Sequence, residues 1–451
     1  MVYSIYDGRG SDPYDPIPLL KMVLYQYLKG NQSPATWFEE ARLNDAMRWL
    51  GRGYQPARRT WYDFRDRCGR FIDQVHEQMI RQAIDGEHLD PATGVQDGTT
   101  VAACASRHRT VCKPTLEKRA EQLTRIIRGE CNDELPRWVP PTQSGRRDLA
   151  ERMEQAAVIL AERIAKNAER PSDKRRDPQK IQVSLSDPVA PPGRDKLKTF
   201  RPLYTVQYVV APHSNLILAY GCEPAVTDAG TLAPMIDRTQ QIVRGRLQRM
   251  IADAAYCSIL DLQDCCRRNI ELLAPVQANS FTEAKVKAKG KTTQISRHEF
   301  EWDKQNQCYH CPRGHRLEYG GRNRKKRHSG RHLWEYRYRC DPEHCSACPL
   351  AGRCLRPGSA SRTVKRLENQ ELLEAQRIKM ADPEIQKCCR LRGQTVERAY
   401  ADSKGNRRLT RFHGRGLSRA RAETGLMVVA QNLLRLDRLE RNPPTPNPIR
   451  I

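Results

Sequence analysis

The sequence has no long apolar segment and no recognisable secretion signal. None of its apolar runs reaches the ~18 residues that a membrane-spanning helix needs. The first residues, MVYSIYDGRGSDPYDP, do not place a basic stretch before an apolar one, as a signal peptide would. We therefore expect a cytoplasmic protein with no membrane partner. In that reducing compartment, the 16 cysteines are expected to be metal ligands or free thiols and not disulfides.

Acidic residues are clearly outnumbered by basic ones. The chain has 53 Asp and Glu against 78 Lys and Arg, which gives a formal net charge of +25 and a pI of about 9.6. Such an excess of positive charge favours binding to a polyphosphate, because each neutralised phosphate releases a counterion. A merely soluble basic surface is the alternative reading. Because the charge is clustered at the motifs described below, we favour a nucleic-acid partner.

Three acidic residues stand in distinctive surroundings. They are Asp97 in GVQDGTTVAA, Asp253 in RMIADAAY and Glu397 in RGQTVERAYADSKGNRR. Each aspartate lies at or near the end of a strand-like run, whereas the glutamate lies on a basic helix. Carboxylates from distant parts of a chain are what a two-metal phosphodiester-cutting site requires. Two alternatives stay open: Glu397 as a solvated ion-pair partner, and Asp187 as a rival first aspartate, although Asp187 suits a turn before Pro188 better.

The pattern of apolar residues predicts a mixed α/β protein. Strand-like runs alternate with helical ones, and the acidic residues at strand ends fit a mixed sheet. We expect an N-terminal helical domain (1–90), the first part of a catalytic core (91–276) with a helical hairpin inserted at 113–175, a Cys-rich insertion (277–385), the Glu397 helix with a C-terminal helix (386–440), and a disordered tail (441–451). The N-terminal helices are equally consistent with DNA contact and with a packing module.

The Cys-rich segment has the spacing of a metal site. It reads Cys308-x2-Cys311, then Cys340-x4-Cys345-x2-Cys348-x5-Cys354, with the strand-like run WEYRYR between the two groups. Paired C-x2-C motifs joined by a strand are the usual form of a four-thiolate Zn²⁺ site. Free thiols and an iron–sulfur cluster are the alternatives. There are more thiols than one zinc needs, and His310, His315 or His344 could replace one of them.

Basic residues surround Glu397 and recur in the Cys-rich segment. Glu397 and Lys404 are seven positions apart, which predicts that they share a helix face, and Arg390 and Arg408 extend it. A second group, which we expect on a loop, comprises Arg322, Arg324, Lys325, Lys326 and Arg327. Both groups are candidates for contact with the phosphate backbone.

Taken in order, these motifs make the chain resemble a DDE transposase of a bacterial insertion sequence, in the branch with a Cys-rich insertion before the catalytic Glu. The DGT, A-D-x-x-Y and V-E-x6-K contexts carry the resemblance, together with PARRTWYDFRDR, FRPLYTVQYVV and CSACPLAGRC. It covers nearly the whole chain and implies a ribonuclease-H-like core. The chain departs from the family at Ala255, where Gly is common, and at Arg398, where Pro is common. Its basic residue before the glutamate, Arg392, lies five positions away.

The resemblance implies a function and a set of site residues. Asp97, Asp253 and Glu397 would hold Mg²⁺ or Mn²⁺ for cleavage at transposon ends and strand transfer into target DNA. The expected phosphate contacts are Arg392, Lys404, Arg408, Lys325, Lys326 and Arg327. The zinc ligands that fit the family best are Cys311, Cys345, Cys348 and Cys354, with Cys308 as the leading substitute.

The expected partner is double-stranded DNA, as terminal inverted repeats and as target, bound near the nucleoid by a homodimer or a larger assembly. The main alternative is a domesticated, non-catalytic DNA-binding protein, which would need no carboxylate triad. A plain ribonuclease-H-like nuclease is the third possibility, and the basic N-terminal module argues against it.

Overall fold

The computed structural model describes residue 3 and residues 14–130, 134–170, 172–277, 295–327 and 330–442. The chain forms two compact units, one of residues 1–251 and 390–451 and the other of residues 252–389. Both units combine helices with β-structure, so the predicted mixed α/β class is confirmed. The predicted disordered tail lies, from residue 443 onward, outside the described residues. Among the helices that the structure describes, none has both the length and the apolar character of a membrane span.

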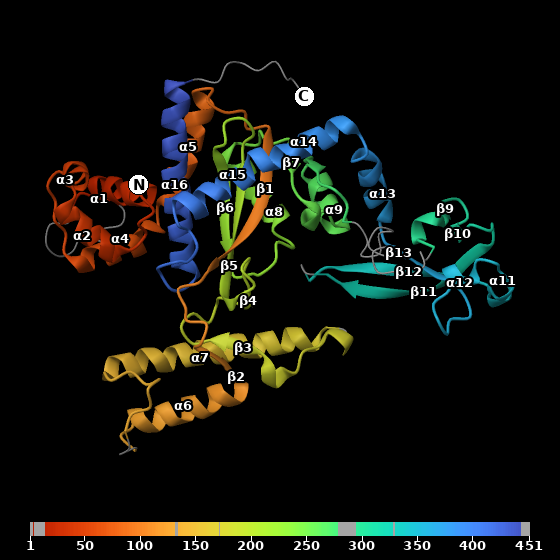
Figure 1. Ribbon diagram of the computed structural model, residues 1–451, viewed down its shortest axis with the longest axis horizontal. Coiled ribbons are helices and arrows are strands. Elements are labelled where there is room, and N and C mark those ends of the chain that lie inside the picture. Colours follow the sequence, from red (N-terminus) through yellow and green to blue (C-terminus); the bar gives the residue numbers. More distant parts are fainter. Residues whose placement is uncertain are drawn as a thin grey trace. The chain divides into compact units, whose positions relative to one another are not determined.

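The first unit begins with five helices (Figure 1). Tyr27, Trp37 and Trp61 are fully buried among them, and the two Trp rings meet edge to face at 6.3 Å. This small aromatic core holds the first four helices together. The helices are α1 (Pro16–Leu28), α2 (Pro34–Leu43), α3 (Asp45–Leu50), α4 (Arg58–Cys68) and α5 (Ile72–Asp85).

A mixed sheet forms the centre of the first unit. Its strands run in the order β6-β5-β1-β7, and β4 also pairs with β5. Strand β1 is antiparallel to β5 and parallel to β7, and β5 is antiparallel to β6. The bounds are β1 (Thr93–Ala102), β4 (Pro192–Arg194), β5 (Phe200–Val210), β6 (Ile217–Glu223) and β7 (Arg249–Ile251). Strand β5 is almost wholly buried, as expected of a strand covered on both faces.

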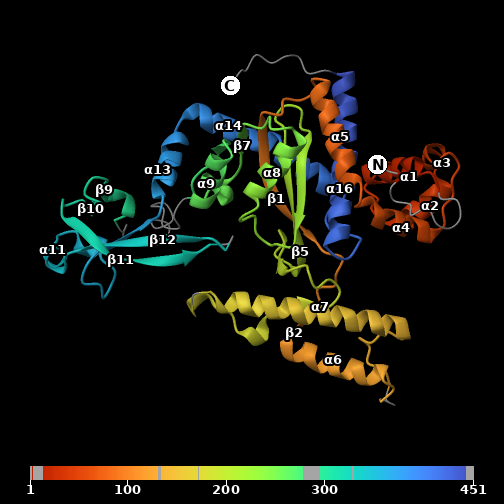
Figure 2. The ribbon, with the colours of Figure 1, turned by 180° about the vertical axis from the view of Figure 1, so that it is seen from behind.

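Helices cover the two faces of this sheet. On one face, α8 (Leu232–Ile242) brings Met235 close to Gly221 of β6. On the other, α16 (Leu417–Arg441) and α5 run side by side, as both views show (Figures 1 and 2). Gly425 permits the close approach of α16, because a Cβ there would lie 2.4 Å from the Tyr220 hydroxyl.

An insertion separates β1 from β5. Its helices α6 (Lys113–Ile127) and α7 (Gln143–Ala168) pack together, and the short strands β2 (Thr110–Cys112) and β3 (Gln182–Ser184) pair at its base. Leu116, Leu123, Met153 and Leu160 belong to its own apolar core. The insertion therefore has a core distinct from that of the sheet.

The second unit contains a five-stranded antiparallel sheet in the order β13-β12-β11-β10-β9. Its strands are β9 (Glu301–Asp303), β10 (Cys308–His310), β11 (Arg316–Lys326), β12 (His332–Cys340) and β13 (Thr363–Leu367). The unit also contains β8 (Glu271–Leu273) and the helices α9 (Ile259–Arg267), α11 (Pro342–Ser346), α12 (Ala351–Cys354) and α13 (Gln370–Lys379). Arg331 joins the sheet to α9 by two hydrogen bonds to Asp264, at 2.8 and 2.6 Å.

Two further helices follow in the chain. Helix α14 (Pro383–Gln394) begins in the second unit and ends in the first, which the chain re-enters at Arg390. Helix α15 (Val396–Ala401) comes next and leads into a π-helical turn, Asp402–Asn406. These elements carry Glu397 and the basic residues around it.

Candidate functional site

Asp97 lies in the middle of β1, opposite Tyr208 of β5. Its side chain is 20% exposed, and Oδ1 accepts a hydrogen bond from the Gly98 amide at 2.8 Å. Residues alternate between the faces of a strand, so Asp97 and Thr99 share one face while Gly98 belongs to the other. The carboxylate is thus fixed on the rigid centre of the sheet and is still accessible to solvent.

Gly98 is required by what lies against the opposite face. A Cβ at this position would lie 1.9 Å from Oδ1 of Asp228 and 2.2 Å from Nε2 of Gln207. Those two side chains hydrogen bond to each other at 2.6 Å. The groups that approach Gly98 most closely are therefore two polar side chains.

Tyr400 fixes the helix that carries Glu397 onto the sheet at the level of Asp97. Its hydroxyl is 2.7 Å from the carbonyl oxygen of Asp97 and 3.0 Å from that of Val206. Its ring stacks on Tyr208, with centroids 4.5 Å apart and planes 10° from parallel. Glu397 lies one turn before Tyr400, in the first turn of α15, and is exposed. Asp97 on β1 and Glu397 on α15 are therefore held near each other by the contacts of Tyr400.

Arg392 contacts the first aspartate directly. It lies in the last turn of α14, and its Nη2 is 3.4 Å from Oδ2 of Asp97. Both side chains are 20% exposed. Sequence analysis predicted that Arg392 contacts a DNA phosphate. In this structure its guanidinium lies beside a carboxylate that is itself a candidate metal ligand.

Lys404 extends the same face of the sheet. Its Nζ donates hydrogen bonds to Oγ1 of Thr99 at 2.7 Å and to the carbonyl of Thr100 at 3.0 Å. Burial, and after it the neighbouring positive charge of Lys196, lower the pKa of Lys404 to about 8. The ammonium is therefore easily deprotonated, and a nearby phosphate would favour its charged form.

The prediction of a single continuous helix face from Glu397 to Arg408 is wrong. Helix α15 ends at Ala401, the π-helical turn follows, and Arg408 has a left-handed backbone with φ of 57°. A π-helical turn changes the angular spacing of side chains, so the seven-residue rule does not apply across it. Lys404 reaches β1 because of that turn, whereas Arg408 is exposed beyond it.

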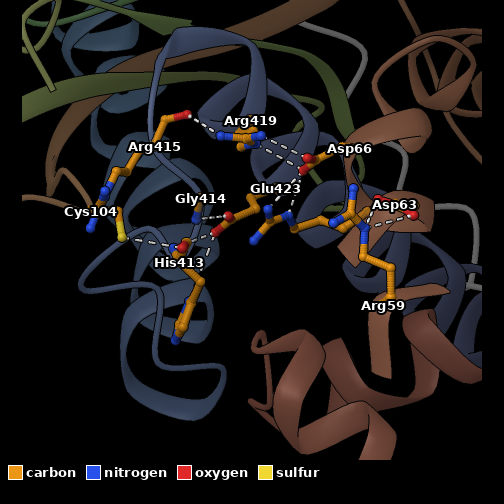
Figure 3. Close-up of polar contacts among 10 residues, drawn as sticks. Arg59, Asp63, Asp66, Cys104, His413, Gly414, Arg415, Arg419 and Glu423 are labelled. Atoms are coloured by element: carbon orange, nitrogen blue, oxygen red, sulfur yellow. Dashed lines mark hydrogen bonds and ion pairs between the residues drawn. The ribbon is translucent and has the colours of Figure 1, made fainter. Parts of the chain in front are cut away.

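The segment after Lys404 is held in place by buried charge (Figure 3). Glu423 of α16 is fully buried and accepts hydrogen bonds from the backbone amides of His413, at 2.9 Å, and of Gly414. Arg419, four residues earlier, donates to both oxygens of Asp66, at 2.9 and 2.8 Å. These contacts tie residues 413–419 to α4 and α16. Upstream, the Phe412 amide donates to the carbonyl of Ala102 at the end of β1.

Asp253 lies two residues after β7, at the start of the second unit. Its Oδ1 accepts a hydrogen bond from the Ala255 amide at 2.7 Å, capping the short 3-10 helix Ala254–Tyr256. The side chain is partly exposed. The rival aspartate, Asp187, has a structural role: it is 2% exposed and accepts from the Tyr204 hydroxyl and the Gly416 amide.

Four of the predicted zinc ligands line one small cavity in the second unit. Its volume is about 30 Å³, and its walls include Cys311, Cys345, Cys348 and Cys354 together with Cys340, His315 and His344. Burial, followed by the hydrogen bond with Cys345, raises the pKa of Cys340 to about 12. Burial also raises the pKa of Cys354, and the nearby thiols of Cys345, Cys348 and Cys311 raise it further. The thiols are therefore close enough to influence one another.

Cys308, the predicted substitute ligand, does not line this cavity. Three positions separate it from Cys311, and residues three apart on an extended strand point to opposite faces. Its neighbours are instead Asp303 and His310. In the part of the chain that the structure describes, these three form the one His, Cys, Asp or Glu group whose ligand atoms all lie within 4.8 Å of one another.

The second basic group lies on a strand and not on a loop. Lys325 and Lys326 end β11, and Arg327 follows at the turn into β12. Lys325 pairs with the buried Glu335 at 2.7 Å, and Arg322 stacks over the ring of Trp334 at 4.2 Å. Part of the positive charge expected to meet DNA is therefore already balanced within the sheet.

Sequence reasoning missed Tyr400 as a site residue. The signal was present, because Tyr400 lies three positions after Glu397 and so one helical turn away. A large aromatic side chain among Arg and Lys on a helix indicates which face of the helix packs against the rest of the protein. Its hydroxyl, which contacts two strand carbonyls, could not be placed without the sheet register.

Two parts of the chain match known transposase families. Residues 310–437 match the family described as Transposase DDE domain. Residues 1–67 match a second family, Transposase domain (DUF772). The first match includes Arg392, Glu397 and Lys404, and it begins after Asp97 and Asp253 in the chain. No curated protein matches the chain. These matches support a transposase, and DDE transposases generally catalyse phosphoryl transfer on DNA with divalent metal ions.

Proposed function

We propose that this protein is a DDE transposase that cleaves DNA at transposon ends and joins the freed ends to target DNA. The observation that carries the proposal is the attachment of the Glu397 helix to β1 at Asp97, through the hydroxyl of Tyr400. The family matches give independent support, because both are transposase domains. We further propose that the sheet is a ribonuclease-H-like core, since an antiparallel β6-β5-β1 meander followed by a parallel β7 fits that fold.

Asp253 is proposed as the third carboxylate on grounds of strand register and chain length. The parallel ladder pairs Val95 with Ile251, and Asp97 and Asp253 each follow their paired residue by two positions. Two residues span at most roughly 7 Å, so neither aspartate can lie far from that last pair. An alternation of side chains that continues beyond the end of β7 would put both carboxylates on the same face of the ladder.

The donor set fits Mg²⁺ or Mn²⁺, both of which prefer carboxylate oxygens. Asp97, Asp253 and Glu397 would hold the ions. When bound, such ions lower the pKa of a hydroxyl nucleophile and offset charge on the phosphate. Asp97 is held with one oxygen on a backbone amide and the other near Arg392, so the carboxylate is oriented before any ion binds.

The basic side chains then position the DNA. Lys404, bonded to Thr99 and Thr100, presents a cation beside the carboxylate face. Arg392 would exchange its contact with Asp97 for one with a phosphate oxygen. Arg408 and the group Lys325, Lys326 and Arg327 would add contacts farther along the DNA. We propose a homodimer or a larger assembly on two transposon ends.

We also propose a structural Zn²⁺ in the Cys-rich sheet, bound by Cys311, Cys345, Cys348 and Cys354. These four thiols line one small cavity, and the sulfur atoms would have to draw closer together to bind one ion. Cys340, His315 and His344 line the same cavity and are the available substitutes.

Cleavage of DNA carrying the inverted repeats that flank the coding sequence tests the proposal. With Mg²⁺, the protein should nick or cut at the repeat ends, and Glu397→Gln should lower the rate by about 10³-fold or more, since several kcal/mol of charge stabilisation is lost. DNA affinity should stay the same or rise slightly, because one negative charge is removed. Glu384→Gln is the matched control, since Glu384 is an exposed glutamate on α14 paired only weakly with Lys387.

Full cleavage by Glu397→Gln would contradict the proposal. DNA binding without any Mg²⁺-dependent cleavage by the wild-type protein would favour the non-catalytic DNA-binding alternative. Cleavage without joining of the ends would favour the plain nuclease.

A further inference from the structure

Asp303, Cys308 and His310 form a cluster on the β9–β10 hairpin, apart from the four cysteines of the proposed zinc site. Cys308 and His310 are two positions apart on β10, so both belong to one face of the strand. Asp303 pairs directly with Cys308 across the hairpin. Trp302 and Tyr309 alternate with them and pack into the apolar core of the sheet. The hairpin thus has one apolar face and one face with three side chains that can bind a metal.

The distances within the cluster suit a bound ion. Nε2 of His310 is 3.8 Å from Sγ of Cys308 and 3.6 Å from Oδ2 of Asp303. A tetrahedral Zn²⁺ with a sulfur at ~2.3 Å and a nitrogen at ~2.0–2.1 Å holds those two atoms roughly 3.5 Å apart. All three ligand atoms lie within 4.8 Å of one another. Only a small contraction would be needed to coordinate one ion.

The surrounding contacts orient the ligands in the required way. Nδ1 of His310 faces the carbonyl of Gly314 at 3.5 Å, so a proton on Nδ1 leaves the Nε2 lone pair directed at the cluster. Oδ1 of Asp303 accepts from the backbone amides of Gln305 and Asn306, and Oδ2 accepts from Nδ2 of Asn306 at 2.7 Å, which holds the carboxylate in place with Oδ2 also facing His310. Cys308 is 1% exposed. A buried cysteine that only fills an apolar core would have apolar neighbours, whereas Cys308 lies beside an imidazole and a carboxylate.

We propose that Asp303, Cys308 and His310 bind a second transition-metal ion of the zinc class, which staples the β9–β10 hairpin. The fourth position would be filled by water or by Glu301, which is paired with His310 across the hairpin. The ion would be structural and separate from both the proposed four-cysteine site and the carboxylate site. The competing explanation is a metal-free ion pair between protonated His310 and Asp303.

Metal analysis of the full-length protein, purified from zinc-supplemented culture, tests this proposal. His310→Gln and Asp303→Asn should each lower bound zinc by about one equivalent per chain, because loss of a ligand weakens the site strongly. Cys348→Ser should remove the equivalent of the four-cysteine site and, because the sheet that carries the hairpin depends on that ion, the second equivalent as well, whereas His310→Gln should remove only one. His332→Gln is the matched control, since His332 is an exposed histidine at the start of β12.

Unchanged zinc content in both His310→Gln and Asp303→Asn would overturn the proposal. If the four-cysteine site were absent instead, Cys348→Ser would lose nothing while His310→Gln still lost one equivalent. Should the variants fail to fold, the absorption spectrum of the wild-type protein reconstituted with Co²⁺ decides, because Co²⁺ bound by one thiolate differs from Co²⁺ bound by four. The proposal expects a one-thiolate component, and its absence would contradict it.

Discussion

The carboxylate face of the first unit and the Cys-rich sheet of the second are built in opposite ways. Tyr400 and Asp97, which join the two parts of the carboxylate face, are 303 positions apart in the chain. The cysteines around the zinc cavity all fall between residues 311 and 354. The first arrangement depends on a buried sheet that brings distant segments together. The second depends on short hairpins around a small apolar core, to which the bonds from the ligands to the metal would add stability.

Loss of zinc should have the largest effect, and it should affect the Cys-rich sheet without affecting the carboxylate face. Cys345→Ser/Cys348→Ser should unfold much of residues 301–367, because structural zinc contributes an apparent ~10–16 kcal/mol in small zinc-dependent folds. Hydrogen exchange should then show lost protection in β11 and β12 and unchanged protection in β1 and β5. The control is Cys266→Ser, at an exposed cysteine of α9. Retained protection in β11 and β12 would mean that the sheet does not depend on metal.

Tyr400→Phe should weaken the carboxylate face without affecting the Cys-rich sheet. The change removes the hydroxyl that contacts the carbonyls of Asp97 and Val206, at a cost of about 1–3 kcal/mol for unsatisfied buried groups. Urea unfolding should report that loss, and cleavage should fall by roughly tenfold as the Glu397 helix loosens. Tyr319→Phe, at a 57% exposed tyrosine, should change neither quantity. If Tyr400→Phe had the stability and the cleavage rate of the wild-type protein, Tyr400 would not hold the Glu397 helix in place.

The lowered pKa of Lys404 predicts that DNA binding depends on pH. Its pKa is about 8 in the free protein, and a nearby phosphate would raise it, so binding takes up a proton above pH 8. Affinity should therefore fall as pH rises through 8 to 10, by up to ~10-fold per pH unit for one proton. Binding measured by fluorescence anisotropy at constant salt should show this slope. Lys404→Arg should flatten it, because arginine stays charged; an equal slope in that variant would exclude Lys404 as the source.

Arg392→Gln should have the smallest effect. A partly exposed pair is worth ~0–1 kcal/mol, so release of Asp97 from Arg392 should raise affinity for Mn²⁺ by at most about fivefold. The same change should weaken DNA binding and reduce its salt dependence, with a slope lower by about 0.9 for one lost phosphate contact. Calorimetric titration with Mn²⁺ checks the first effect. Weaker Mn²⁺ binding would show that Arg392 supports the site and does not compete for it.

The sequence was sufficient for features that depend on local order. The strand around Asp97, the two helices of the hairpin expected at 113–175 and the run WEYRYR as a strand all follow from short patterns. The clustering of Cys311, Cys345, Cys348 and Cys354 also agrees with their spacing. In these cases neighbouring residues determine the conformation, and their periodicity is visible in one segment.

Features that depend on packing were not predictable in the same way. The π-helical turn after Ala401 redirects Lys404 to Thr99 and separates Arg408 from the helix. Whether Arg392 contacts DNA or Asp97 depends on where the end of α14 lies against β1. No local sequence pattern determines that position. Cys308 was grouped with Cys311 by a spacing rule for knuckles, but it belongs to a regular strand, in which a separation of three reverses the face.

Iron-mediated backbone cleavage tests most directly the central claim that Asp97, Asp253 and Glu397 hold the same metal ions. Fe²⁺ replaces Mg²⁺ at carboxylate sites and, with ascorbate and peroxide, produces radicals that cut the chain nearby. The account predicts cuts close to residues 97, 253 and 397, all competed away by Mg²⁺ and all lost together in Asp97→Asn. Cuts near only one of these residues, or cuts near 253 and 397 that persist in Asp97→Asn, would contradict it.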